Sequence, residues 1–112
     1  MIKIYCLINP LTGIPFYVGA TRRTLHARFV SHVGASNVKT YSITKSSTRA
    51  NLIKSLMSQG LKPHISCLMI VSPDVADYCE SHFYNYFISQ GIDLLQSPHR
   101  FTYQQHYCKN KS

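Results

Sequence analysis

The sequence predicts a single α+β domain in which helices flank a three-stranded antiparallel sheet. Three β-rich runs, at 2–8, 14–18 and 64–71, alternate with helical periodicity in the order strand–strand–helix–helix–strand–helix. The chain has 112 residues, of which 45% are hydrophobic. That is enough apolar material for one core and too short a chain for a second domain of ordinary size.

The first two strands are expected to form a hairpin. Between 2–8 and 14–18 lies a short segment in which Pro10 fixes φ and Gly13 tolerates a positive φ. Two β-rich runs with so short a break predict antiparallel pairing. Gly19 is expected to end the second strand.

Two helices joined by a polar loop are expected next. Thr21 is a suitable N-cap for a helix over 22–33. Residues 34–47 are small, polar and basic, which favours a loop, and a second helix is predicted over 48–59, with Gly60 as its stop signal. The apolar residues at helical spacing, which should face the core, are Leu25, Phe29, Val33, Leu52, Ile53 and Leu56.

Residues 64–71 form a nearly continuous apolar run, which is typical of a buried strand. Ser72 and Pro73 then resemble an N-cap and the first residue of a helix over 73–90, which Gly91 closes. The residues of this helix at core spacing are Val75, Cys79, Phe83, Tyr86 and Phe87.

The chain is strongly basic. Twelve Lys and Arg residues against four Asp and Glu residues give a formal charge of +8, which favours polyanionic partners. Nucleic acid is the first candidate partner and an anionic membrane surface the second, and a basic protein without either is the alternative. After the predicted domain, residues 1–96, the pattern fades into a basic, polar tail, residues 97–112.

The sequence favours a cytoplasmic protein. It has no run of about 18 apolar residues that would span a bilayer, and its first residues read as strand and turn, not as a secretory signal. The four cysteines contain no C-x-x-C pair, so reduced thiols are expected.

Two tripeptides in the hairpin resemble the pair that names the GIY-YIG nuclease family. Lys3-Ile4-Tyr5 is followed, after eleven residues, by Tyr17-Val18-Gly19, with Lys3 in the place of a glycine and Val18 in the place of an isoleucine. The family also has an arginine on the next helix and a glutamate on a later one. The positions that match these are Arg28, with His32 one turn on, and Glu80.

The resemblance covers residues 3–96 and implies a DNA endonuclease that depends on Mg²⁺ or Mn²⁺, one ion per site, and leaves a 5′ phosphate. The family usually places an asparagine after the glutamate helix. Here Gln96 follows Leu94 and Leu95, and it offers the same amide on a longer arm.

The few acidic residues favour a one-metal site. Phosphodiester hydrolysis needs an activated water and charge relief on the phosphoryl oxygens, for which hard cations with carboxylate ligands are suited. Asp74 lies in the first turn of its predicted helix, where it is expected to be structural. Asp77 and Glu80 are three apart, but a two-metal site needs more carboxylates, so Glu80 is the expected sole side-chain ligand. The alternative is an ordinary surface glutamate.

The remaining roles follow the same resemblance. Tyr5 is the candidate general base and Tyr17 its positioning group, and nearby cations would favour the phenolate; alternatively both tyrosines simply pack on the sheet. Arg28 is assigned to the scissile phosphate, because a guanidinium fork matches two phosphate oxygens. His32 is expected to bind a phosphate or relay a proton, or else to be structural.

Other basic residues are candidates for phosphate contacts along DNA, which position a protein without reading sequence. Alternatively they are solvated surface charge. They are Arg22, Arg23, Lys39, Lys45 and Arg49. A zinc site is a weaker alternative, and its ligands would come from His99, His106 and Cys108 with His82 or Cys79.

The leading hypothesis is therefore a metal-dependent DNA endonuclease. A domain that binds DNA without cutting it is the alternative, because Lys3 and Gln96 depart from the family pattern. A basic module that binds RNA or another protein is the third reading. Dimerisation or a partner protein would supply targeting of the cut.

Overall fold

One antiparallel sheet of three strands lies at the centre of the molecule. Its middle strand β1 (Ile2–Ile8) pairs with β2 (Pro15–Thr21) on one side and with β3 (His64–Val71) on the other. The computed structural model describes residues 1–36 and 45–96. The predicted α+β class and order of elements are confirmed.

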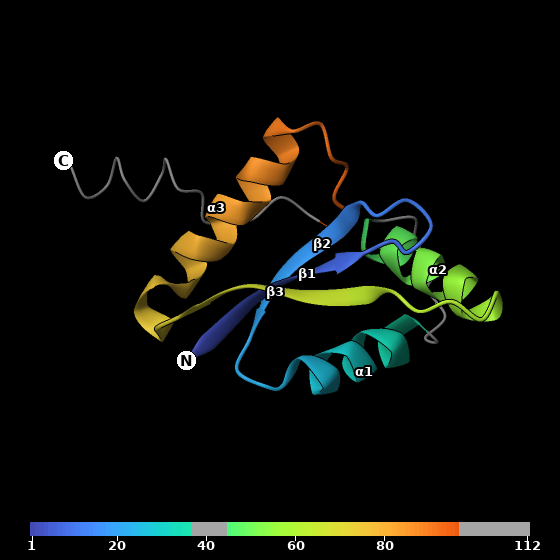
Figure 1. Cartoon of the computed structure of the whole chain (residues 1–112), viewed down its shortest axis with the longest axis horizontal. Coiled ribbons are helices and arrows are strands. Elements are labelled where there is room, and N and C mark those ends of the chain that lie inside the picture. The colour runs from blue at the N-terminus through green and yellow to red at the C-terminus, as the bar shows by residue number, and fades with distance from the viewer. Residues whose placement is uncertain (37–44, 97–112) are drawn as a thin grey trace.

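The helices cover both faces of this sheet (Figure 1). α1 (Leu25–Ser36) and α2 (Lys45–Ser58) pack on each other and on one face, whereas α3 (Ala76–Ser89) packs on the other face. A 3₁₀ turn, Pro73–Val75, connects β3 to α3.

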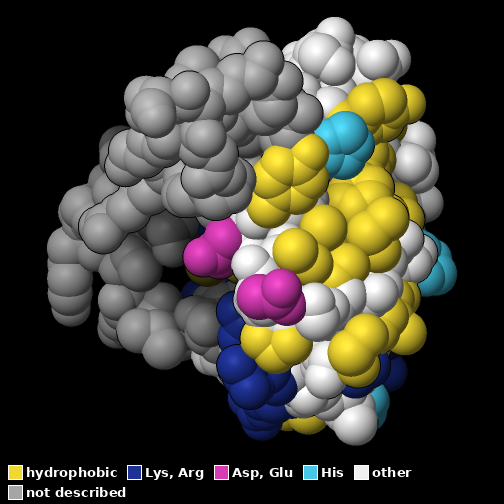
Figure 2. Space-filling model, turned by 90° about the vertical axis from the view of Figure 1, so that its left-hand side faces the viewer, with side chains coloured by type: hydrophobic (Ala, Val, Ile, Leu, Met, Phe, Trp, Pro, Cys, Tyr) yellow, Lys and Arg dark blue, Asp and Glu magenta, His cyan; other side chains and the backbone are white. Residues whose placement is uncertain are grey.

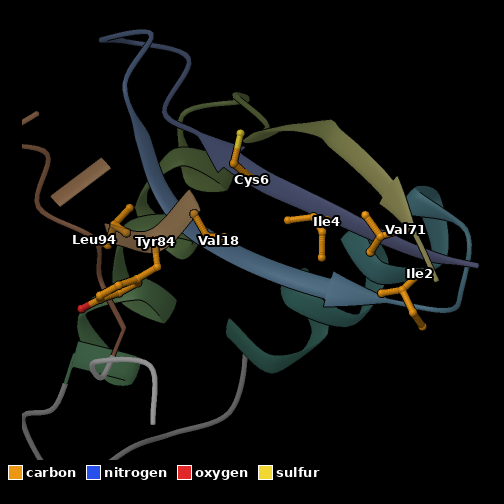
Figure 3. Packing of buried hydrophobic residues seen from close by; sticks show 7 residues of the cluster. All are labelled: Ile2, Ile4, Cys6, Val18, Val71, Tyr84 and Leu94. Carbon is orange, nitrogen blue, oxygen red and sulfur yellow. The ribbon is translucent and has the colours of Figure 1, made fainter. Parts of the chain in front are cut away.

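Side chains of β1 contribute to two buried clusters, one on each face of the sheet, because successive side chains of a strand point to opposite faces. Ile4 and Cys6 face α3 in a cluster with Val18, Val71 and Tyr84. Figure 3 shows the Tyr84 side chain beside Val18 at one end of this cluster. The intervening residues of β1 face α1 and α2, in a second buried cluster that consists of Tyr5, Leu7, Phe16 and Ile53.

The second strand and the first helix differ from the prediction. β2 continues through Gly19 to Thr21, since Gly19 pairs with Tyr5 in the ladder. Thr21 does not cap α1: its Oγ1 accepts a hydrogen bond of 3.0 Å from the backbone N–H of Arg23 and closes a turn. The cap is Thr24, whose Oγ1 accepts from the N–H of Ala27 at 3.1 Å.

The predicted loop 34–47 was too long, because α1 extends to Ser36 and α2 begins at Lys45. The strand over 64–71 is confirmed, but it is not buried. β3 is an edge strand, and Met69 and Ile70 are exposed, the latter at 57%.

Ser72 was predicted to cap the last helix, but it makes no capping bond; its hydroxyl instead donates to the Asp74 carboxylate. The 3₁₀ turn places Val75 before α3, whereas Cys79, Phe83 and Phe87 pack against the core as predicted. Val75 and Tyr86, predicted in the core, are exposed at 39% and 52%, and Tyr84 is buried instead.

None of the helices within residues 1–36 and 45–96 is long and apolar enough to cross a bilayer. In the same part of the chain Cys6, Cys67 and Cys79 are free cysteines.

Candidate functional site

Two tyrosines of the hairpin lie on the same face of the sheet. Tyr5 pairs with Gly19 and Leu7 pairs with Tyr17, so Tyr17 is the diagonal neighbour of Tyr5 across the strands. Their ring centroids are 6.0 Å apart. Tyr5 is fully buried and Tyr17 is half-buried.

Helix α1 lies over these rings and directs two polar side chains at Tyr5. Arg28 and His32 are four residues apart and therefore share a face of the helix. Nε of Arg28 donates to the Tyr5 hydroxyl at 2.9 Å, and the same hydroxyl lies 2.8 Å from Nε2 of His32.

The proton positions in this chain are only partly fixed by its chemistry. A guanidinium only donates, so the Tyr5 oxygen accepts from Arg28, whereas the direction of its bond to His32 depends on which ring nitrogen carries the proton. In the tautomer with the ring proton on Nδ1, Nε2 of the neutral imidazole accepts from the Tyr5 hydroxyl. The Tyr17 ring packs edge-to-face against His32, at a centroid distance of 4.9 Å.

Burial controls the protonation of both groups. Burial, together with the charges of Arg28 and Arg49, lowers the pKa of His32 to about 4, so the imidazole is neutral at pH 7. Burial raises the pKa of Tyr5 and Tyr17 raises it further, whereas Arg28 acts in the opposite direction. The expected effect of nearby cations on Tyr5 is present, but desolvation outweighs it, and Tyr5 is a neutral phenol in the free protein.

Gly19 is required by this packing. A Cβ atom there would lie 2.6 Å from the Tyr5 hydroxyl oxygen and 2.8 Å from a ring carbon of Tyr17. Gly19 therefore makes room for both rings, which explains why a glycine stands in the middle of β2. The tripeptide Tyr17-Val18-Gly19 was the sequence signal for this position, although its reason is tertiary.

Arg49 joins the cluster from α2. Its Cζ lies 4.5 Å from the centroid of the Tyr17 ring, and its Nη1 donates to the backbone carbonyl of Leu95 at 3.0 Å. The sequence predicted a DNA contact for Arg49, with no link to the tyrosines. Nothing in its spacing signals the contact with Tyr17, because α2 and β2 meet only in the folded chain.

Gln96 binds the outer edge of β2. Its Oε1 accepts from the backbone N–H of Val18 at 2.8 Å, and its Nε2 donates to the Val18 carbonyl at 3.0 Å. The N–H of Leu95 donates to the Phe16 carbonyl at 2.8 Å. The segment after α3 thus continues the hydrogen-bond ladder on both sides of Tyr17.

Glu80 lies on the side of α3 that faces the sheet. It follows Ala76 and precedes Tyr84 by one turn each, and it is half-buried between them.

The neighbours of Glu80 on α3 pack toward β2. Tyr84 packs in one cluster with Val18, while Ala76 and Ala20 line one surface pocket. Glu80 lies one helical turn from each of these helix residues, on the helix that packs against β2. The structure thus brings four predicted residues into direct contact on the face that α1 and α2 cover, whereas Glu80 belongs to the helix on the opposite face of the sheet. These four are Tyr5, Tyr17, Arg28 and His32.

The donor set limits what cation this region can hold. Within residues 1–36 and 45–96 there is no group of three or more His, Cys, Asp or Glu side chains arranged for a metal. Mg²⁺ commonly keeps several water ligands and binds through one or two carboxylates plus substrate phosphate, so a half-buried Glu80 fits such an ion. For the zinc alternative, His99, His106 and Cys108 lie outside the described residues.

Other predicted DNA contacts are dispersed. Arg22 and Arg23 are exposed in the turn before α1, not on the helix, and the Arg23 carbonyl accepts from Nζ of Lys3 at 3.3 Å. Lys45 is the first residue of α2, although a loop was predicted for it, and Lys39 lies outside the described residues. Figure 2 shows acidic side chains beside a group of Lys and Arg at the border of an apolar region.

No protein-family model matches the chain, and no curated protein or solved structure matches it either.

Proposed function

We propose that this protein is a divalent-metal-dependent DNA endonuclease of the GIY-YIG type. The observation that carries the proposal is the hydrogen-bonded chain Arg28–Tyr5–His32, with the Tyr17 ring against it. Two tyrosines that only packed on a sheet would not require a buried hydroxyl between a guanidinium and a neutral imidazole. Perturbed pKa values in a cluster of titratable groups are typical of functional sites.

Tyr5 and His32 together make a better base than either alone. Because burial raises the pKa of Tyr5, the phenol gives up its proton only to a partner that is already in place. His32 is that partner, with a free electron pair on Nε2 at 2.8 Å. In the proposed step, the attacking water transfers a proton to the Tyr5 oxygen while the Tyr5 proton passes to His32.

Substrate binding would promote this transfer. The Arg28 guanidinium uses Nε for Tyr5 and has further N–H groups that fit the oxygens of a phosphate. The negative charge of that phosphate offsets the charges of Arg28 and Arg49, which lower the pKa of His32 in the free protein. His32 therefore becomes a stronger proton acceptor when DNA is bound.

Glu80 would hold the cation, with water and a phosphate oxygen as the other ligands. Such an ion, when bound, supplies charge relief at the phosphoryl oxygens and at the departing 3′ oxygen. The chain itself contributes a half-buried carboxylate on α3, the helix that packs against β2. The formal charge of +8 supports DNA as the substrate.

The test is cleavage of supercoiled plasmid by the purified protein with Mg²⁺ or Mn²⁺. Replacing Glu80 with Gln keeps the shape and removes the charge, and it should lower the cleavage rate by about 100-fold or more. Asp77→Asn, which neutralises an exposed acid on the same helix, is the matched control and should cut normally. Equal cutting by wild type and Glu80→Gln would mean that the activity belongs to another site or to a contaminant.

A second outcome would select the alternative. Salt-sensitive DNA binding with no cleavage in either metal would identify a module that holds DNA without cutting it.

A further inference from the structure

The guanidinium of Arg49 makes two different contacts at once. Its Cζ lies over the Tyr17 ring, 4.5 Å from the ring centroid, which is within the range of a cation–π contact. One of its edge N–H groups donates to the Leu95 carbonyl at 3.0 Å. A planar group can stack on a ring and donate from its edge, which a lysine ammonium cannot do.

These two contacts connect three separate parts of the chain. Arg49 lies on α2, Tyr17 on β2, and Leu95 in the segment after α3. Leu95 in turn binds the backbone of Phe16, and Gln96 binds both backbone groups of Val18. Tyr17 is therefore held through its ring and through both of its neighbours in the strand.

The Tyr17 ring also contacts His32, the proton acceptor of the proposed mechanism. His32 packs edge-to-face on Tyr17 at 4.9 Å, so any shift of the Tyr17 ring changes the surroundings of the Tyr5–His32 bond. The charge of Arg49 also contributes, after burial and Arg28, to the low pKa of His32.

We propose that Arg49 is a positioning residue of the cleavage site, which fixes the Tyr17 ring against His32, and not a contact to the DNA backbone. This inference rests on the proposed function and refines it. The arginine is half-buried and its guanidinium is engaged by the protein itself, which distinguishes it from exposed Arg22 and Arg23.

Two substitutions separate positioning from phosphate binding. Arg49→Met keeps an unbranched apolar side chain and removes the charge and the N–H groups, while Arg49→Lys keeps the charge and removes the planar fork. We expect both to lower kcat by about 10- to 100-fold, because small misplacements at a reacting site have effects of this size. KM and the slope of log Kd against log salt should stay as in the wild type. Lys54→Met, which removes an exposed cation from the same helix, is the matched control.

A phosphate contact predicts the opposite result. The salt slope would fall by about one in Arg49→Met, and Arg49→Lys would keep the wild-type kcat. Either finding would overturn the positioning role. If Arg49→Met fails to fold, the kcat of Arg49→Lys decides between the two assignments.

A readout without cleavage keeps this inference apart from the proposed function. In an NMR titration of the metal-free protein, the midpoint of His32 in Arg49→Met should rise from the value of about 4 expected for the wild type, and the Tyr17 ring signals should shift. Unchanged His32 and Tyr17 signals would overturn the inference even if the protein cuts DNA. A wild type that never cuts would overturn only the proposed function.

Discussion

The hydroxyl of Tyr5 and Nε2 of His32 lie 2.8 Å apart, although 27 residues separate them in the chain. Tyr5 comes from the central strand, where it is fully buried, and His32 comes from the helix that covers this face. The same bond therefore connects the sheet to α1, and in the proposed mechanism it also carries the proton from Tyr5 to His32. Stability and the proposed activity should respond together when it is removed.

Replacing Tyr5 with Phe removes the shared oxygen and nothing else. We expect the free energy of unfolding to fall by about 1–3 kcal/mol, because buried His32 and part-buried Arg28 lose a hydrogen-bond partner. DNA cleavage should be lost, while DNA affinity is retained. Urea denaturation and a plasmid assay measure the two effects.

The control for Tyr5→Phe is Tyr86→Phe, since Tyr86 is 52% exposed on α3. It should leave stability and cleavage unchanged. Cleavage by Tyr5→Phe at the wild-type rate would exclude Tyr5 as the base.

His32 should make stability depend on pH in a defined window. Its pKa is about 4 in the folded protein and 6.5 ordinarily, so between these values the unfolded chain binds a proton that the folded chain does not. The free energy of unfolding should therefore fall as pH is lowered from 6.5 to 4, and this contribution should level off below 4.

Urea denaturation of wild type and His32→Gln across this range measures that dependence, and the glutamine variant should show a shallower fall between pH 6.5 and 4. His26→Gln, which removes an exposed histidine from the same helix, controls for the loss of an imidazole as such. Equal pH dependence in wild type and His32→Gln would contradict the buried neutral imidazole.

Two glycine-to-alanine substitutions should have opposite effects. At Gly19 a methyl group would lie 2.6 Å from the Tyr5 oxygen, so the tyrosine rings must move, at a cost of about 1–3 kcal/mol in stability and a loss of cleavage. At Gly34, in α1, a methyl group meets nothing within 4 Å and should stabilise the helix by about 0.5–1 kcal/mol. Thermal denaturation measures the stability of both variants. A Gly19→Ala variant as stable as the wild type would disprove the close packing of the rings.

Gln96 should act through β2. Gln96→Ala leaves the buried backbone groups of Val18 without their side-chain partner. This should lower the free energy of unfolding by about 1–3 kcal/mol and slow cleavage. Gln96→Glu keeps an acceptor for the Val18 N–H but presents a carboxylate to the Val18 carbonyl, so it should also be destabilised. Hydrogen exchange of the Val18 backbone amide measures the effect locally. Unchanged exchange in both variants would contradict the two hydrogen bonds between Gln96 and Val18.

Much of the fold was predictable because its signals are local. Apolar runs of β character, the turn around Gly13 and the helical spacing of Ile53 and Leu56 gave the correct order of elements. The start of the first helix was predicted less accurately, because Thr21 and Thr24 are both suitable caps. Thr21 is still part of β2, so Thr24 caps the helix. The burial of β3 was misjudged, because its apolar run does not show that it lies at an edge of the sheet.

The sequence by itself predicted the order of the elements, and it singled out the tyrosines, the arginine, the histidine and the glutamate on them as candidate site residues. Only the tertiary structure decided that the Tyr5 hydroxyl lies between Arg28 and His32. The same holds for the contact of Arg49 with the Tyr17 ring and for the hydrogen bonds of Gln96 to the backbone of β2. The physical reason is that periodicity and turn residues act over one or two turns of chain. Contacts such as Gln96 to Val18, 78 residues apart, form only when the packed helices and sheet bring the two ends of the domain together.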